Sequence, residues 1–162
     1  GVVGGGKVKA FTLGGISGGM LSGDFLDLTL DFKKPQEYDT FLGSGALVVL
    51  GEDSCVVDFA RSCAVFFEDE SCGKCYPCRI GAVRMRELMD GISGNSSLIP
   101  DTLNHIKEIG DVMTTASACG LGQSAPKVLQ GMVKYFSEEL DSHITKRVCP
   151  TNVCGFDANN MS

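Results

Sequence analysis

The sequence predicts an α+β fold in which a β-rich module is followed by a bundle of four helices. Three observations lead to this prediction. Residues 1–54 are rich in glycine and in β-branched or alternating apolar residues, a composition typical of short strands joined by turns. Residues 55–145 carry apolar residues at helical spacing. Residues 146–162 show neither pattern, and we expect them to form a tail or linker.

Three short strands are predicted in the first module. Their sequences are VKAFTLG (8–14), LDLTLDF (26–32) and ALVVLG (46–51). The turn-forming segments GGISGG, KKPQEYD and GSG separate or flank them. GGISGG is the nearest approach to a nucleotide-binding loop, but it is expected to lie between strands and not to open a helix, so it is interpreted as a turn.

Four helices are predicted after this module. The first has an apolar stripe with helical spacing, formed by Val56, Phe59, Ala60, Cys63, Ala64 and Phe67. A second helix is expected from about Arg79 to Asp90, closed by Gly91. A third should begin at Pro100 and Asp101. The fourth should start after Ser124, with Pro126 in its first turn, and continue beyond Phe136 to Leu140.

Composition narrows the class of protein. A net charge of −6 argues against nucleic acid or an anionic membrane surface as the main partner. No apolar run approaches the roughly 18–20 residues of a membrane span, so no direct membrane insertion and a cytoplasmic location are expected. The chain opens with GVVGGGKVK and without Met, which we interpret as the cut end of a longer protein.

The cysteines form the most specific pattern in the sequence. Cys72, Cys75 and Cys78 lie at successive spacings of three, too close to pair easily as disulfides but suited to wrap one face of a metal cluster. Iron–sulfur clusters take four thiolates, and Cys119 in the turn SACGLG is the candidate fourth ligand. We therefore predict one [4Fe–4S] cluster. The alternative is a structural zinc site of four thiolates, although the spacing does not resemble paired zinc knuckles.

The segments ESCGKCYPCR (70–79) and ACGLG (118–122) resemble the C-terminal region of the NADH-binding flavoprotein subunit of respiratory complex I. The same type of subunit occurs in NAD(P)-linked or electron-bifurcating hydrogenases and in NAD-dependent formate dehydrogenases. GGISGG, LDLTLDF and LGSGALVV look like the ubiquitin-like (β-grasp, soluble-ligand-binding) module of that family. The resemblance extends to about residue 143 and implies that residues 1–54 form a partial β-grasp module.

The resemblance also implies a function. In the family, a [4Fe–4S] cluster accepts single electrons from an FMN that has taken a hydride from NADH, and its ligands fall on Cys72, Cys75, Cys78 and Cys119. The FMN- and NAD(P)-binding domain precedes this region, so the chain alone should bind no flavin and transfer no hydride. Implied partners are a ferredoxin-like [2Fe–2S] subunit and a cluster-rich subunit. A hydrogenase is favoured as the host enzyme over complex I or formate dehydrogenase, because the hydrogenase relatives continue with a CP-type cysteine pair. The competing interpretation is a zinc-stabilised interaction module without redox function.

Four cysteines and two histidines remain outside this set. Cys63 lies on the apolar stripe and is expected in the core, and His105 is expected to be solvated. His143, Cys149 and Cys154 fall between positions 143 and 154, where a short turn could gather them around one ion. Cys55, off the stripe at the start of the first helix, is the predicted fourth ligand of a Cys₃His zinc site. The alternative is that Cys149 and Cys154 are free thiols, or ligands only in the full-length protein.

Overall fold

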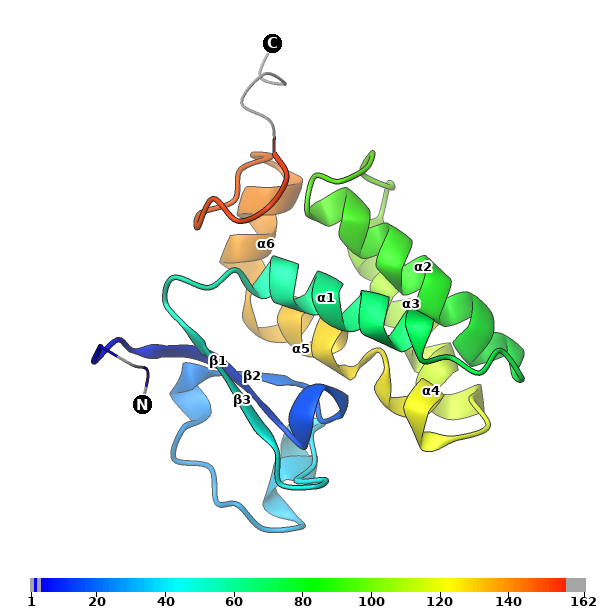
Figure 1. Cartoon of the computed structure of the whole chain (residues 1–162), viewed down its shortest axis with the longest axis horizontal. Coiled ribbons are helices and arrows are strands. Elements are labelled where there is room, and N and C mark those ends of the chain that lie inside the picture. Colours follow the sequence, from blue (N-terminus) through cyan, green and yellow to red (C-terminus); the bar gives the residue numbers. More distant parts are fainter. Residues whose placement is uncertain (1, 3, 157–162) are drawn as a thin grey trace.

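The computed structural model describes residues 2 and 4–156 of the chain. Figure 1 shows a small β-module on one side of the molecule and the helices on the other. The sheet has three antiparallel strands in the order β2-β1-β3. They are β1 (Val8–Leu13), β2 (Met20–Ser22) and β3 (Leu47–Gly51). The predicted strands at 8–14 and 46–51 are therefore confirmed, and GGISGG forms a 3₁₀ turn between β1 and β2.

The prediction of a strand at 26–32 is wrong. This segment forms turns and extended chain, and it does not join the sheet. Of its three alternating leucines only Leu28 packs against a core cluster, while Leu26 and Leu30 are 58% and 61% exposed. The chain turns away at Asp31, whose carboxylate accepts the backbone N–H groups of Lys33 at 2.8 Å and Lys34 at 2.6 Å. A local side-chain bond of this kind competes with strand pairing.

Six α-helical segments follow among the described residues, where the sequence predicts four. They are α1 (Val56–Asp69), α2 (Tyr76–Ile92), α3 (Thr102–Ala116), α4 (Gly120–Ser124), α5 (Lys127–Tyr135) and α6 (Ser137–Ile144). The first three predicted helices are present with shifted ends, and α2 continues through Gly91 to Ile92. The predicted fourth helix is broken at Phe136, which has φ −126° and ψ 43° and separates α5 from α6. Its apolar spacing continues across this break, so periodicity could not reveal it.

One continuous core joins the helices to the sheet. Helix α1 packs against α2 and α5, and α5 packs against β2. The core includes fully buried Met89, Leu129 and Met132 from the helices together with Met20 from β2. A Cβ at Gly131 would clash with the backbone of Met20, so α5 approaches β2 this closely only because residue 131 is glycine.

The two ends of α1 lead to the two groups of predicted metal ligands. Cys55 is the N-cap of α1, and the segment with Cys72, Cys75 and Cys78 follows its last turn. Fourteen residues at 1.5 Å per residue make α1 about 21 Å long, so the groups lie at opposite ends of the helical region (Figure 1). In the part of the chain that the structure describes, no helix is long and apolar enough to cross a membrane. Positions 157–162 of the predicted tail lie outside the described residues.

Candidate metal centres

The first group of cysteines lies where α1, α2 and α4 meet. Cys75 is the N-cap of α2, Cys78 lies in the first turn of α2, and Cys119 is the N-cap of α4. Cys78 is buried and Cys75 is half-buried, whereas Cys72 and Cys119 are exposed. All four are free thiols. The group therefore sits at the surface with its sulfurs available as ligands.

Two contacts join the segment 72–78 to the distant turn 117–122. A Cβ at Gly122 would lie 2.8 Å from the Cβ of Cys78 and 2.6 Å from the Oγ of Ser117, so only glycine permits this approach. The backbone N–H of Ala118 faces Cys75. Its hydrogen bond to the sulfur is the largest effect that lowers the pKa of the Cys75 thiol, followed by the hydrogen bond from the N–H of Cys78. Both contacts bring the turn that carries Cys119 against the segment that carries Cys75 and Cys78, although Cys119 lies 41 positions beyond Cys78 in the sequence.

This arrangement fits a four-iron cluster. Each thiolate of such a cluster binds a different iron, so the four sulfurs need not surround a single ion. Three thiolates on one segment and a fourth on a neighbouring turn complete the set that a [4Fe–4S] cluster requires. The Oγ of Ser117 supports the fit, because it is buried and has no hydrogen-bond partner among the described residues. A buried hydroxyl of this kind needs an acceptor, and no pattern in the sequence indicated it.

The second group gathers side chains from two distant parts of the chain, the start of α1 and the stretch from α6 onward. The sulfurs of Cys55, Cys149 and Cys154 and a ring nitrogen of His143 all lie within 4.8 Å of one another. Among the described residues, this is the one set of three or more potential ligand atoms so close together. His143 is fully buried and comes from α6, while Cys149 and Cys154 come from the segment that follows it. The structure thus brings together all four residues predicted for a Cys₃His site.

The spacing of three of these donor atoms, those of Cys55, Cys154 and His143, matches a tetrahedral ion. The Nε2 of His143 lies 3.4 Å from the sulfurs of both Cys55 and Cys154. The sulfurs of Cys55 and Cys154 are 3.6 Å apart, far longer than the ~2.05 Å of a disulfide. A tetrahedron with Zn–S bonds of ~2.3 Å and Zn–N bonds of ~2.0–2.1 Å separates its ligand atoms by about 3.5–3.8 Å. The three observed distances therefore suit one zinc-sized ion.

The histidine is oriented as a metal ligand. Its Nδ1 lies 2.7 Å from the backbone carbonyl oxygen of Glu139. A carbonyl oxygen only accepts, so Nδ1 carries the hydrogen and donates it. In the neutral ring, Nε2 then has a free electron pair, and that atom faces Cys55 and Cys154. A backbone carbonyl behind a ligating histidine is the usual way in which proteins fix its tautomer.

The contacts within the second group shift the pKa values of its side chains. The pKa of Cys55 is lowered to about 3, chiefly because Cys154 donates a hydrogen bond to its sulfur, with His143 as a further donor. The pKa of Cys154 is raised, because its proton is held by Cys55. Burial lowers the pKa of His143, but the contact with Cys55 and the Glu139 carbonyl outweigh it and raise the value to about 9. A thiolate stabilised in a buried place favours binding of a cation.

The remaining candidate residues lie apart from both groups. Cys63 is buried in the core, as predicted, and burial raises the pKa of its thiol to about 12. His105 is half-buried on α3. The carboxylate of Glu139 was not foreseen from the sequence. It accepts the N–H of Val56 at 3.0 Å and pairs with Lys9 at 2.6 Å, so it ties β1 and the start of α1 to the helix that carries His143.

The fold and the first cysteine group define a small iron–sulfur domain built on helices beside a three-stranded sheet. Residues 58–143, more than half of the chain, match the family described as NADH-ubiquinone oxidoreductase-F iron-sulfur binding region. The chain belongs to this family.

Similar proteins support the assignment. The NADP-reducing hydrogenase subunit HndC of Solidesulfovibrio fructosivorans is 36% identical over 146 residues, which are 90% of this chain and 30% of that subunit. A subunit of the NADH-quinone oxidoreductase of Streptomyces coelicolor is 35% identical over 144 residues, 89% of this chain and 32% of that one. The chain therefore spans about a third of the length of these curated relatives.

A solved structure supports the fold. It is an NAD⁺-reducing [NiFe]-hydrogenase in the H₂-reduced state, with a TM-score of 0.69, 23% identity, and coverage of 86% of this chain and 24% of that chain.

Proposed function

We propose that the chain holds a [4Fe–4S] cluster through Cys72, Cys75, Cys78 and Cys119 and that this cluster relays single electrons. The observation that carries the proposal is the junction of two distant cysteine segments, where Gly122 packs on Cys78 and the N–H of Ala118 faces Cys75. Membership of a family defined by its iron–sulfur binding region makes an iron–sulfur cluster the natural occupant of such a junction.

The chain's own residues would hold the cluster and adjust its affinity for electrons. When bound, the cluster supplies one-electron chemistry. The N–H of Ala118 and the unpartnered hydroxyl of Ser117 would donate hydrogen bonds toward its sulfurs, and such bonds stabilise the reduced state. Lys74 and Arg79, both exposed beside the ligand segment, would offset its negative charge. The exposure of Cys72 and Cys119 leaves one side of the site open to an electron donor or acceptor.

The activity of the whole subunit is proposed by analogy with the relatives. We infer that the chain is part of an NAD(P)H-oxidising or NAD(P)⁺-reducing flavoprotein subunit, in which FMN and the pyridine nucleotide bind outside residues 1–162. A hydrogenase is the preferred host, with complex I or formate dehydrogenase as alternatives. The 36% and 35% identities to a hydrogenase subunit and to a quinone oxidoreductase subunit do not separate these hosts. Residues 1–54 would form the partial β-grasp module and residues 55–145 the iron–sulfur domain of this subunit.

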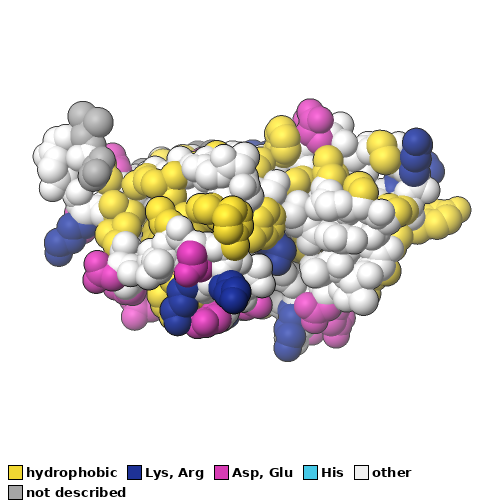
Figure 2. All heavy atoms as spheres, turned by 90° about the horizontal axis from the view of Figure 1, so that it is seen from below, with side chains coloured by type: hydrophobic (Ala, Val, Ile, Leu, Met, Phe, Trp, Pro, Cys, Tyr) yellow, Lys and Arg dark blue, Asp and Glu magenta, His cyan; other side chains and the backbone are white. Residues whose placement is uncertain are grey.

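Partner subunits are part of the same proposal. Figure 2 shows apolar side chains exposed across much of one face of the molecule, with charged side chains mainly along one margin. Large apolar residues such as Phe32 and Tyr76 are 77% and 79% exposed, which suits a chain that is covered by others in an assembly. We propose a ferredoxin-like [2Fe–2S] subunit and a cluster-rich subunit as those partners, in the cytoplasm or at the cytoplasmic face of a membrane complex.

We further propose that Cys55, His143, Cys149 and Cys154 bind one structural zinc ion. Four protein ligands close the coordination sphere, and zinc has no redox chemistry, so this site would serve stability only. It would tie the segment after α6 to the start of α1, and thereby fix where residues 146–162 leave the domain.

Anaerobic metal analysis tests both proposals together. Protein purified without oxygen should be brown, contain about four irons per chain and about one zinc, and lose its absorbance near 400 nm when dithionite is added. A colourless protein that contains zinc alone would refute the electron relay and leave a zinc-stabilised interaction module. Iron without zinc, with Cys149 and Cys154 both alkylated rapidly in the folded protein, would refute the zinc site.

A further inference from the structure

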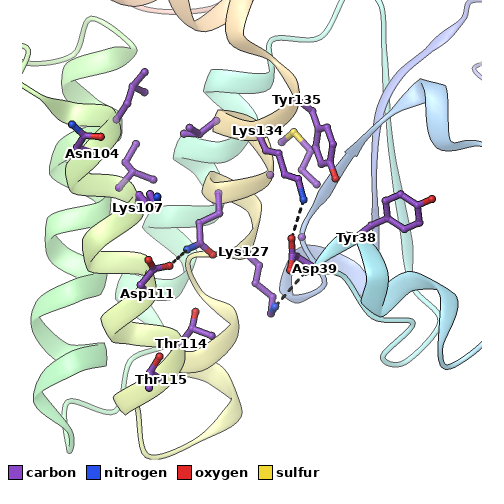
Figure 3. Close-up of a pocket in the computed structure, with 17 residues that line it drawn as sticks. Tyr38, Asp39, Asn104, Lys107, Asp111, Thr114, Thr115, Lys127, Lys134 and Tyr135 are labelled. Carbon is purple, nitrogen blue, oxygen red and sulfur yellow. Dashed lines mark hydrogen bonds and ion pairs between the residues drawn. The ribbon is translucent and has the colours of Figure 1, made fainter.

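A groove of about 750 Å³ lies between α3, α5 and the β-module, away from both cysteine groups (Figure 3). Its volume falls within the roughly 300–1,000 Å³ of small-molecule sites, and such sites occur preferentially where two structural units meet. None of the residues proposed above as metal ligands lines it. The groove therefore requires an explanation of its own.

The floor of the groove is apolar and its walls are polar. Met20 and Ile106 are fully buried at its base, and half-buried Val133 adjoins them. Hydroxyl and amide groups lie along α3 and α5, including Thr114 and Gln130. A few polar groups around an apolar floor are the usual composition of a site for an organic molecule.

Three lysines give the groove its charge. Lys107 comes from α3, and Lys127 and Lys134 come from α5. Two carboxylates oppose them, those of Asp39 and Asp111, so the lining has a formal charge of +1 in a chain whose net charge is −6. In the described part of the chain, no carboxylate lies within ion-pairing distance of Lys107 or Lys127. Two ammonium groups thus have no fixed counter-charge.

Asp39 lies where an anionic ligand would be held. Lys127 and Lys134 both point across the groove toward it (Figure 3). The Nζ of Lys134 is 2.9 Å from the Asp39 carboxylate, and the Nζ of Lys127 is 3.3 Å from its backbone oxygen. The Asp39 side chain is 81% exposed. Exposed ion pairs contribute little to stability, so an incoming anion can displace this carboxylate at small cost.

We propose that the groove binds a small organic polyanion of nucleotide size, with its anionic groups between Lys127 and Lys134 in place of the Asp39 carboxylate. Lys107 on the opposite wall contacts a further anionic group, and the apolar floor contacts the organic body. A polyanion fits better than a monocarboxylate, because three lysines supply separate point charges. Arginine, in contrast, is the residue that binds a single carboxylate through two parallel hydrogen bonds.

Calorimetric titration of the metal-loaded protein tests this site. The probes are pyrophosphate, adenosine diphosphate and adenosine, which separate the phosphate chemistry from that of the organic body. We expect saturable one-to-one binding of adenosine diphosphate, weaker binding of pyrophosphate and none of adenosine. Lys127→Gln or Lys107→Gln should weaken binding about tenfold, which corresponds to ~1.4 kcal/mol.

Asp39→Asn gives the discriminating result. It removes the competing carboxylate, and Asn tolerates the left-handed backbone (φ 59°) found at this position, so anion affinity should rise. A purely structural role for Asp39 predicts no such gain. The control is Lys33→Gln, an exposed lysine outside the groove, which should leave binding unchanged.

Three results would overturn the proposal. The first is the absence of binding by any probe up to about 10 mM, a limit that corresponds to less than ~3 kcal/mol. The second is an equal loss of affinity in Lys33→Gln, which would show general charge attraction only. The third is binding of an acidic polypeptide such as polyglutamate, lost in Lys127→Gln, without binding of any small probe, which would assign the groove to a protein partner.

Discussion

The two cysteine groups use the same ligand chemistry in opposite surroundings. At one end of α1, Cys72 and Cys119 are exposed and the segments that carry them meet through a glycine. At the other end, His143 and Cys149 are buried, and all four donor atoms lie within 4.8 Å of one another. Exposure suits a redox centre that must exchange electrons with a neighbour, whereas burial and close spacing suit a single ion that only holds the chain together.

The comparison indicates that two cysteine groups at opposite ends of α1 can have separate functions within one small domain. A redox-inactive ion bound by the second group would lie about 21 Å away, the length of α1, and could not take part in electron transfer at the other end. The second group can therefore stabilise the fold without altering the path of the electrons. If this division is correct, changes at one group should leave the metal of the other in place.

Loss of a cluster ligand should have the largest effect. Cys119→Ala removes the single ligand that the second segment contributes, so one iron is left without its thiolate. We expect the iron content to fall from about four per chain to three or fewer, with loss or conversion of the electron paramagnetic resonance signal of the reduced protein. Zinc content should be unchanged. The matched control is Cys63→Ala, a buried cysteine in neither group, which should keep both metals; an unchanged signal in Cys119→Ala would remove Cys119 from the site.

Loss of the buried ion should have the next largest effect. Cys154→Ser replaces a ligand that lies 3.4 Å from His143 and 3.6 Å from Cys55. A ligand that binds only the folded state stabilises it by about 4 kcal/mol when its free concentration is a thousand times the dissociation constant. We therefore expect a fall of this order in the free energy of unfolding and loss of about one zinc per chain. Equal melting temperatures, or an equal loss of iron, would contradict the division between the groups.

The junction at the first group can be broken without touching a ligand. In Gly122→Ala the new Cβ would lie 2.8 Å from Cys78 and 2.6 Å from the Oγ of Ser117. Overpacking of this kind costs typically about 1–3 kcal/mol, and we expect a matching loss of stability together with incomplete iron content. Gly120→Ala is the control, because nothing lies within 4 Å of its added methyl group. Normal iron content in both variants would show that the contact does not assemble the site.

The sequence predicted the candidate sites better than the fold. Three cysteines as close together as Cys72, Cys75 and Cys78 have few uses other than metal binding, so residue type and spacing alone indicated an iron–sulfur cluster. Cys63 lies on the apolar stripe of the first helix and Cys55 does not, which indicated Cys55 as the ligand. The structure places Cys55 beside His143, and ligation of a metal there stays a prediction. The iron–sulfur family and the proximity of Cys55 to His143 are confirmed, because both inferences rest on chemistry that only a few residue types possess; the assignment of Cys72, Cys75, Cys78 and Cys119 as cluster ligands stays a prediction.

What the sequence could not supply were contacts made by residue types that have many possible roles. Nothing local to Ser117 or Glu139 shows that one is buried without a partner and that the other joins two helices and a strand. The alternation in 26–32 matched a strand, but the segment pairs with no strand of the sheet, and Asp31 accepts local backbone N–H groups instead. At Phe136 the apolar period continues although the backbone leaves the helical region.

The smallest expected effect concerns the link between the second group and the β-module. Glu139 is 10% exposed at its side chain, pairs with Lys9, and accepts the N–H that begins α1. Glu139→Gln keeps an oxygen for Val56 but removes the charge, so we expect a loss of about 1 kcal/mol in the free energy of unfolding, the difference between a charged and a neutral hydrogen bond. The zinc content should stay the same, because His143 is held by the backbone carbonyl of residue 139 and not by its carboxylate. Asp141→Asn is the control: its pair with Lys146 spans 3.4 Å at the surface, and its removal should leave the stability nearly unchanged. Equal losses in the two variants would show that the buried pair does not join the module to the metal site, whereas loss of zinc in Glu139→Gln would show that the carboxylate also positions the ligands.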